Sequence, residues 1–177
     1  VPQKRERIFI VGIRNDLAQK FEFPDSTHGE GLKPKSKLKD VIDSLWPEDE
    51  KYFFSQRAVE GVKKAKPNMK RALAQDLNEQ CLTITSHLAK VSLNSRDPVL
   101  LVDPEKELYR RFSPREAARI QSFPDIFNFV GSQGDAYRQI GNAIPPVVMW
   151  HLVQKLENYL STEEQLSLFD DKKVSSF

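Results

Sequence analysis

Hydrophobic residues in this 177-residue chain occur in short runs and helical repeats. Residues 8–13 and 99–102 are short apolar runs rich in β-branched side chains, and each predicts a buried strand. A weaker strand pattern covers residues 82–85. Apolar positions spaced i, i+3, i+4 and i+7 predict helices over residues 36–47 and 55–67, each with a serine at its start and a proline at its end.

The C-terminal part of the sequence contains clearer helix signals. Residues 113–116, Ser-Pro-Arg-Glu, form a capping box with proline at the first helical position, and the predicted helix ends before Phe123. A further helix is predicted from Ala136, with a break at Gly141 and Asn142. The next proline pair opens a last helix that is apolar on most sides, so we expect it to be buried against a large body. Its apolar residues are Val147, Val148, Met149, Trp150, Leu152, Val153 and Leu156.

Composition narrows the class of protein. With 39% hydrophobic and 29% charged residues, the sequence is typical of a soluble globular protein, and we expect a cytoplasmic one without a membrane partner. The single cysteine, Cys81, excludes an internal disulfide and a cysteine-rich zinc site; we expect it to be structural and expect no metal. Six basic residues lie between Arg57 and Arg71 against one acidic residue, which fits either a solvated helix face or a phosphate-binding face.

Three blocks of sequence follow one another in a fixed order. They are Gln3–Arg7 (QKRER), Arg111–Asp125 (RFSPREAARIQSFPD) and Gln139–Pro146 (QIGNAIPP). Together they resemble motifs VIII, IX and X of the DNA (cytosine-5)-methyltransferases, separated by a stretch of the length expected for a target-recognition domain. The glycine-rich cofactor loop, the Pro-Cys nucleophile loop and the Glu-Asn-Val block of that family are absent from this sequence.

The resemblance implies an α/β fold. We expect a C-terminal fragment of a doubly wound S-adenosylmethionine-dependent methyltransferase domain plus a small mixed α/β target-recognition domain. The expected segments are the motif VIII strand (1–23), the target-recognition domain (24–107), the motif IX segment (108–131), the motif X segment with its helix (132–160) and a flexible tail (161–177).

The resemblance also implies roles for individual residues. Methylation of cytosine C5 requires the base to be flipped out of the duplex, and charge then develops on the N3 and O2 side of the ring. Arg7 would reach the base O2, and Arg5 would order the catalytic loop or the neighbouring sugar-phosphate; the alternative is that both arginines pair with carboxylates at a strand edge. Motif X would border S-adenosylmethionine through Asn142, Ala143 and Ile144. The alternative is that this segment is a simple break between two helices. Motif IX is expected to organise the recognition domain.

Residues 83–85, Thr-Ile-Thr, resemble a small-domain signature whose first threonine contacts a phosphate near the flipped base. The alternative is that Thr83 is an ordinary threonine in a half-buried strand. The expected DNA-binding residues are Thr83, Thr85, His87, Lys70, Arg71 and Arg96.

The tail contains a second short resemblance. Gln165-Leu166-Ser-Leu168-Phe169 is similar to the pentapeptide that binds bacterial sliding clamps, with Leu and Phe as hydrophobic anchors. The alternative is that these side chains pack on the protein's own surface.

The leading hypothesis is the C-terminal part of a DNA (cytosine-5)-methyltransferase, expected in a restriction–modification system. Its partners would be double-stranded DNA, the N-terminal catalytic half and, through the tail, a sliding clamp. Exposed apolar surface around residues 8–13 and 147–156 would favour dimerisation, and the isolated chain is expected to be inactive. The alternatives are a stand-alone DNA-binding specificity module and the small subunit of a split methyltransferase.

Overall fold

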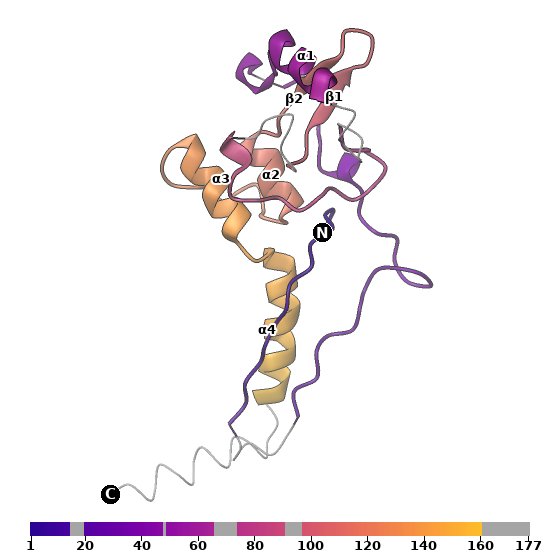
Figure 1. The fold of residues 1–177 in the computed structure, drawn as a ribbon. Helices are drawn as coiled ribbons and strands as arrows, with labels where there is room; N and C mark the ends of the chain where they lie inside the picture. The colour runs from indigo at the N-terminus through magenta and orange to yellow at the C-terminus, as the bar shows by residue number, and fades with distance from the viewer. Residues whose placement is uncertain (15–19, 48, 66–73, 91–96, 161–177) are drawn as a thin grey trace, which may run out of the picture.

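The computed structural model describes residues 1–14, 20–47, 49–65, 74–90 and 97–160. The elements from η1 to α3 form a head, and the long helix α4 projects from it as a stem (Figure 1). In chain order the elements are η1 (Leu38–Asp40), η2 (Glu50–Tyr52), α1 (Gln56–Ala65), η4 (Leu88–Lys90), β1 (Leu100–Asp103), β2 (Leu108–Arg110), α2 (Pro114–Ile120), α3 (Gln133–Asn142) and α4 (Pro146–Leu160).

Strands β1 and β2 form an antiparallel pair. Leu100 faces Arg110 and Leu101 faces Tyr109, with an irregularity before Asp103. The strand predicted at 99–102 is therefore confirmed with a shift of one residue, and its partner β2 was not predicted. The described residues contain this two-stranded sheet and no doubly wound parallel sheet.

The hydrophobic core lies inside the head. Helix α3 packs against both α2 and η4, while β1 supplies Leu100 from the sheet. The largest apolar side chains in this core are Leu38, Ile84, Leu88, Leu100, Phe112, Ile120, Tyr137 and Ile140.

Helices α2 and α3 of the head begin at serine caps. Ser113 and Glu116 form the predicted capping box of α2, which confirms that helix. Helix α3 begins at Gln133, three residues before the predicted start, because Ser132 and Asp135 form a second capping box. Gly141 and Asn142 belong to the last turn of α3, so the break predicted there falls later, at residues 143–145. Helices α1 and α4 are also confirmed, although Pro67 lies outside the described residues.

The helix predicted over residues 36–47 is wrong. The chain forms only the short 3-10 turn η1. The backbone amides of Leu38 and Lys39 donate to the carbonyls of Glu79 and Leu77, at 2.9 Å each. These tertiary hydrogen bonds replace the start of the helix, while Leu38 is still buried as its apolar pattern requires.

Two predicted strands are not formed among the described residues. Residues 82–85 are irregular, and next to them Cys81 makes an isolated parallel bridge with Gln3. Residues 8–13 are extended without strand pairing, with Ile8 and Ile10 91% and 92% exposed. Exposure alternates from residue to residue along this segment, so its side chains point to two opposite sides as in a strand. Its backbone has no neighbouring strand in the described chain.

Cys81 is fully buried, and burial raises the pKa of its thiol well above the ordinary value. A thiol in this setting is a poor source of thiolate, so the geometry agrees with a structural cysteine.

Candidate functional site

The three blocks recognised in the sequence meet in the head. Their meeting point, here called the junction, consists of Gln3, Arg5, Ile84, Gln121 and Gly141, which are joined by side-chain hydrogen bonds. The bridge between Gln3 and Cys81 holds the N-terminal segment against it: Lys4 N donates to Cys81 O and Cys81 N donates to Pro2 O, both at 2.8 Å.

Two buried amide side chains form the centre of the junction. Gln3 is 4% exposed and Gln121 is fully buried. Gln3 donates to the side-chain oxygen of Gln121, and Gln121 donates to the carbonyl of Ile140 at 2.8 Å. The oxygen of Gln3 accepts from Ile84 N at 3.3 Å. Buried polar groups need such partners, so these bonds fix the relative positions of all three blocks.

Arg5 joins two backbone segments. Its Nη1 donates to the carbonyl of Ile84 at 2.9 Å, and its Nη2 donates to the carbonyl of Gly141 at 3.2 Å. Burial, and then the charge of nearby Arg7, lower the pKa of the Arg5 guanidinium, although an arginine stays charged in proteins. The structure therefore places Arg5 as a bridge within the chain, and among the described residues it has no carboxylate partner.

Gly141 makes a close backbone contact. A Cβ atom at this position would lie 2.2 Å from Ser86 N and 2.2 Å from the carbonyl carbon of Thr85. The glycine is thus required for the end of α3 to pack on residues 85–86.

Arg7 lies two residues beyond the bridge and is exposed. Its Nη1 donates to the carbonyl of the adjacent Glu6 at 2.5 Å. Because this bond is local and exposed, the guanidinium can exchange it for a ligand at little cost.

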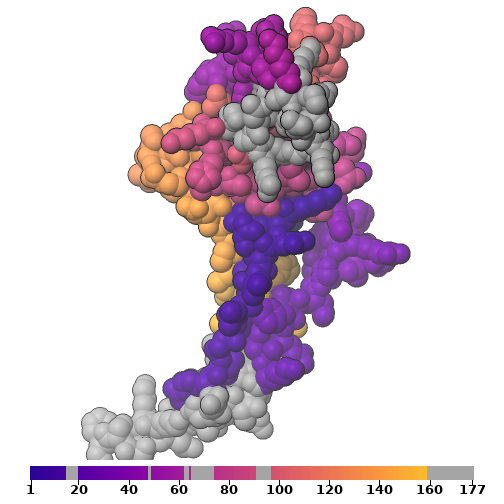
Figure 2. Space-filling model, viewed as in Figure 1, coloured from indigo at the N-terminus to yellow at the C-terminus, as the bar shows by residue number. Residues whose placement is uncertain are grey.

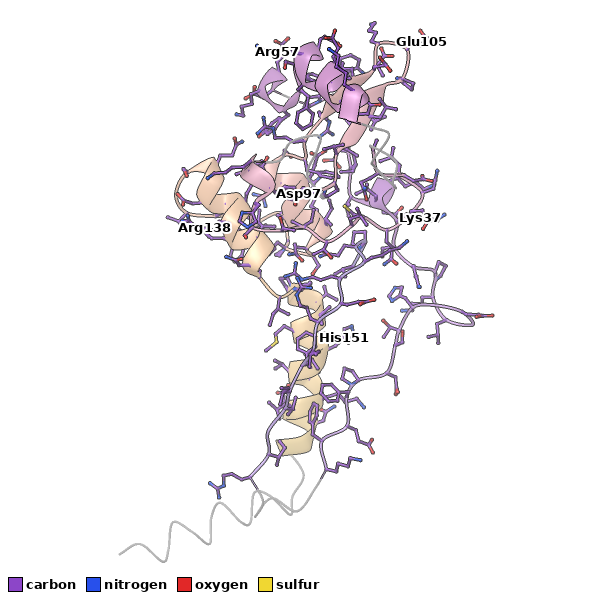
Figure 3. All side chains as sticks on the ribbon, in the orientation of Figure 1. Lys37, Arg57, Asp97, Glu105, Arg138 and His151 are labelled. Atoms are coloured by element: carbon purple, nitrogen blue, oxygen red, sulfur yellow. The ribbon has the colours of Figure 1, made fainter. Side chains whose placement is uncertain are left out.

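The predicted DNA-binding threonines are engaged inside the chain. Thr83 Oγ1 donates to the carbonyl of Lys4 at 2.7 Å, and Thr85 Oγ1 donates to Asp97 at 2.7 Å, a carboxylate that also lies in the head (Figure 3). His87 is exposed, and its backbone N donates to Thr85 Oγ1 at 3.2 Å. Lys70, Arg71 and Arg96 lie outside the described residues, as do Gln165, Leu166, Leu168 and Phe169 of the tail.

The predicted cofactor segment begins where α3 ends. Asn142 is exposed, Ala143 caps the helix through its N–H, and Ile144 is 47% exposed. This turn presents one amide side chain and one apolar side chain to solvent, which suits one wall of a site for an amphipathic ligand.

The motif IX helix is held by ion pairs. Arg110, 1% exposed, makes a bidentate pair with Glu116 at 2.7 and 2.8 Å and also donates to the carbonyls of Ser44 and Leu45. Arg119 pairs with Asp125 and Asp43, which raises the pKa of Arg119 and lowers that of Asp125. These partners lie inside the chain, which fits the organising role expected for motif IX.

Sequence reasoning did not single out Gln3, Gln121 or Arg110 as site residues. All three lie inside or beside the matched blocks, but a sequence does not show that a glutamine or an arginine is buried. A cavity of about 680 Å³ beside α2, lined in part by Trp46, Lys51 and Arg115, does not include any junction residue.

Helix α4 has two different faces. Val148 and Leu152 are half-buried, whereas the outer face, formed by Val147, Met149, Trp150 and Val153, is 44–58% exposed. Figure 2 shows the N-terminal segment on the surface, running from the head down along the stem in this view. The described residues contain no helix that could cross a membrane and no cluster of His, Cys, Asp or Glu that could hold a metal.

A family model for C-5 cytosine-specific DNA methylases matches residues 1–158, which include all of the junction. The chain belongs to this family. The methylase chain is 33% identical over 182 residues to the type II methyltransferase M.BsuRI of Bacillus subtilis, covering 90% of this chain and 39% of that protein. It is 35% identical over 184 residues to M.DsaV of Dactylococcopsis salina, covering 98% of this chain and 48% of that protein.

Solved structures support the α/β methyltransferase fold. The Dnmt2 methyltransferase of S. pombe matches with a TM-score of 0.57 at 17% identity, over 72% of this methylase chain and 43% of that chain. The Entamoeba histolytica methyltransferase EhMeth matches with a TM-score of 0.56 at 18% identity, over 81% and 46% respectively. The methylase chain thus spans about half the length, or less, of the curated relatives described above.

Proposed function

We propose that this chain is the C-terminal part of a DNA (cytosine-5)-methyltransferase of a restriction–modification system. Its function is to recognise a duplex DNA sequence and to help methylate C5 of a flipped cytosine. The observation that carries the proposal is the family match over residues 1–158, together with the meeting of the three blocks at one junction. The type II names of the relatives support the assignment to restriction–modification.

Arg7 acts on the flipped base. As a thiolate adds to C6, negative charge develops toward N3 and O2, and a guanidinium directed at O2 stabilises that charge more in the transition state than in the ground state. The exposure of Arg7 and its local hydrogen bond to the carbonyl of Glu6 support this role. In the complete enzyme, Arg7→Ala should reduce the rate of methyl transfer far more than DNA affinity; equal losses in both would contradict the role.

S-adenosylmethionine supplies the methyl group when it is bound. In this chain Asn142, Ala143 and Ile144 would form one wall of its site, while the glycine-rich loop and the nucleophile loop would come from the N-terminal half. The solvent-facing amide of Asn142 and the exposed Ile144 fit that wall.

DNA binds residues 83–87, and the basic residues Lys70, Arg71 and Arg96 are proposed as further DNA contacts. Thr83 contacts a phosphate by exchanging its hydrogen bond to the carbonyl of Lys4, and the exposed His87 makes a second contact. Contacts to the phosphates would position the chain and contacts to base edges would give sequence preference, so the target sequence depends on the loops of this region.

The outer face of α4 binds the N-terminal catalytic half. Its apolar side chains and those of Ile8 and Ile10 are exposed, and this chain matches only 39% and 48% of the two relatives described above. Without that half, the same surface favours self-association.

A reconstitution experiment tests the proposal. The chain and a cognate N-terminal half are assayed for transfer of radiolabelled methyl to duplex DNA, separately and mixed. Activity only in the mixture is expected; sequence-specific DNA binding by this chain without activity in the mixture would favour a stand-alone specificity module.

The tail is proposed to bind the sliding clamp, on the basis of Gln165, Leu166, Leu168 and Phe169. A tail peptide should bind the clamp, and replacement of Leu168 and Phe169 by alanine should abolish binding. If the wild-type and the alanine-substituted peptides bind the clamp equally, or if neither binds, the clamp is not a partner of this tail.

A further inference from the structure

We propose that Arg5 is a positioning residue that couples the DNA-contacting segment 83–87 to the cofactor-facing turn 142–144. The inference rests on the proposed function for the identity of the two ligands. The bridge itself rests on the hydrogen bonds from Arg5 to the carbonyls of Ile84 and Gly141.

One acceptor of Arg5 lies within the DNA-contacting segment, and the other lies directly before the cofactor-facing turn. Ile84 lies between Thr83 and Thr85, and Gly141 directly precedes Asn142. One planar guanidinium holds both carbonyls, at 2.9 and 3.2 Å, so the two segments cannot move apart without loss of a charge-assisted hydrogen bond.

Close packing makes the bridge stiff. Because Gly141 has no side chain, the end of α3 can pack directly against the backbone of Thr85 and Ser86. On the other side, the buried chain of hydrogen bonds from Ile84 through Gln3 and Gln121 reaches Ile140. A shift of residues 83–87 is therefore transmitted to the start of the turn.

Two binding events that order one rigid unit assist each other. Cofactor that orders 142–144 removes part of the ordering cost for DNA at 83–87, and linkage requires DNA to strengthen cofactor binding by the same factor. Arg5 thus contributes to the cooperativity of the two ligands, whereas Arg7 acts on the base itself.

Hydrogen exchange on the present chain tests the bridge. In Arg5→Ala, the amides of 84–86 and 142–144 should exchange about tenfold faster, because a charge-assisted hydrogen bond is lost, while those of α2 should be unchanged. Lys4→Ala is the matched control, since Lys4 is exposed and its side chain pairs with the exposed Glu79. Unchanged exchange in either segment, or equal acceleration throughout the head, would overturn the bridge.

Arg5→Lys keeps the charge but lacks the planar fork. In Arg5→Lys, slow hydrogen exchange should be kept in one of the two segments and not in both. This variant still tests the bridge if Arg5→Ala fails to fold. Full protection of both segments by lysine would overturn the requirement for a two-pronged donor.

Coupling is measured on the chain reconstituted with its N-terminal half. Duplex DNA affinity is determined with and without S-adenosylhomocysteine; a wild-type enhancement in the usual range of about 5- to 150-fold should fall below about threefold in Arg5→Ala and persist in Lys4→Ala. An unchanged enhancement in Arg5→Ala would overturn the coupling. If wild type binds neither ligand, the proposed function fails, and the exchange pattern still decides whether Arg5 holds the bridge.

Discussion

The junction and the outer face of α4 differ in the polarity and the burial of their side chains. At the junction, polar side chains such as Gln3 and Gln121 are buried, and their partners come from the same chain. On α4, Trp150 and Val153 are apolar and 58% and 45% exposed. The head therefore buries these polar side chains against partners from its own chain, whereas the stem leaves apolar surface that another body can cover.

This contrast separates residues that stabilise the chain from residues that stabilise an assembly. Loss of a buried polar partner leaves an unsatisfied group inside the protein, so junction and head variants should change the free energy of unfolding. Exposed apolar residues contribute little to folding but contribute to association when they are covered. The following variants test that division.

Arg110→Ala should have the largest effect on stability. The variant leaves Glu116 without its bidentate partner and removes the donor to the carbonyls of Ser44 and Leu45. Breaking a buried ion pair from one side costs about 3–5 kcal/mol, which urea unfolding of the chain would detect. Arg138→Ala, which breaks the exposed pair with Asp135, should cost less than about 1 kcal/mol. Similar losses in both variants would show that burial does not decide the energetics of the head.

Gly141→Ala should destabilise the junction by about 1–3 kcal/mol, because the new methyl group has no room against residues 85–86. Gly134→Ala is the matched control on the same helix α3. Its nearest neighbour would be Ser132 Oγ at 3.7 Å, so the better helix propensity of alanine should stabilise the chain by about 0.5–1 kcal/mol. Thermal unfolding of both variants measures the difference; a loss in Gly134→Ala as large as that in Gly141→Ala would argue against the close contact.

The same contrast explains which parts of the fold were predictable. Local signals such as the Ser113 capping box and the Pro146 helix start were sufficient for α2 and α4. Residues 8–13 carry the pattern of a strand, but a strand also needs a neighbour, and none lies in the described chain. The predicted helix after Ser36 does not form because the amides of Leu38 and Lys39 donate to the carbonyls of distant residues 79 and 77, which no local pattern encodes.

The candidate site was predictable only where a resemblance pointed to it. The resemblance brought the three blocks together in one family, and the structure adds that their contact runs through Gln3 and Gln121. Glutamine and arginine are usually exposed, so their sequence context predicts solvent contact when the fold buries them instead. The role of Arg5 depends on carbonyls 79 and 136 residues away, which its own block does not indicate.

Replacing Trp150 and Val153 together by serine should leave the free energy of unfolding within about 0.5 kcal/mol, because both residues lie on the exposed outer face of α4. Sedimentation velocity at increasing concentration should show less self-association than in wild type, and binding to the N-terminal half should weaken. Asn158→Ser, an exposed polar change on the same helix, should alter neither property. A double variant that unfolds more readily would place these residues in the chain's own core and remove the distinction between head and stem.

The smallest effect is expected from Asp125, an exposed carboxylate that belongs to the head. Its hydrogen bonds with Arg119 lower the pKa of its carboxyl in the folded state. A depressed folded pKa contributes stability above the unfolded value of about 3.9, and that contribution is lost as the pH falls through the lower folded value. Asp125→Asn should therefore reduce the thermal midpoint slightly at pH 7 and progressively less below about pH 4, and 1 M salt should diminish the difference at pH 7. The exposed Asp25→Asn serves as the control. A deficit in Asp125→Asn that grows as the pH falls would mean that this carboxylate is a cost to the folded head, contrary to its pairing with Arg119.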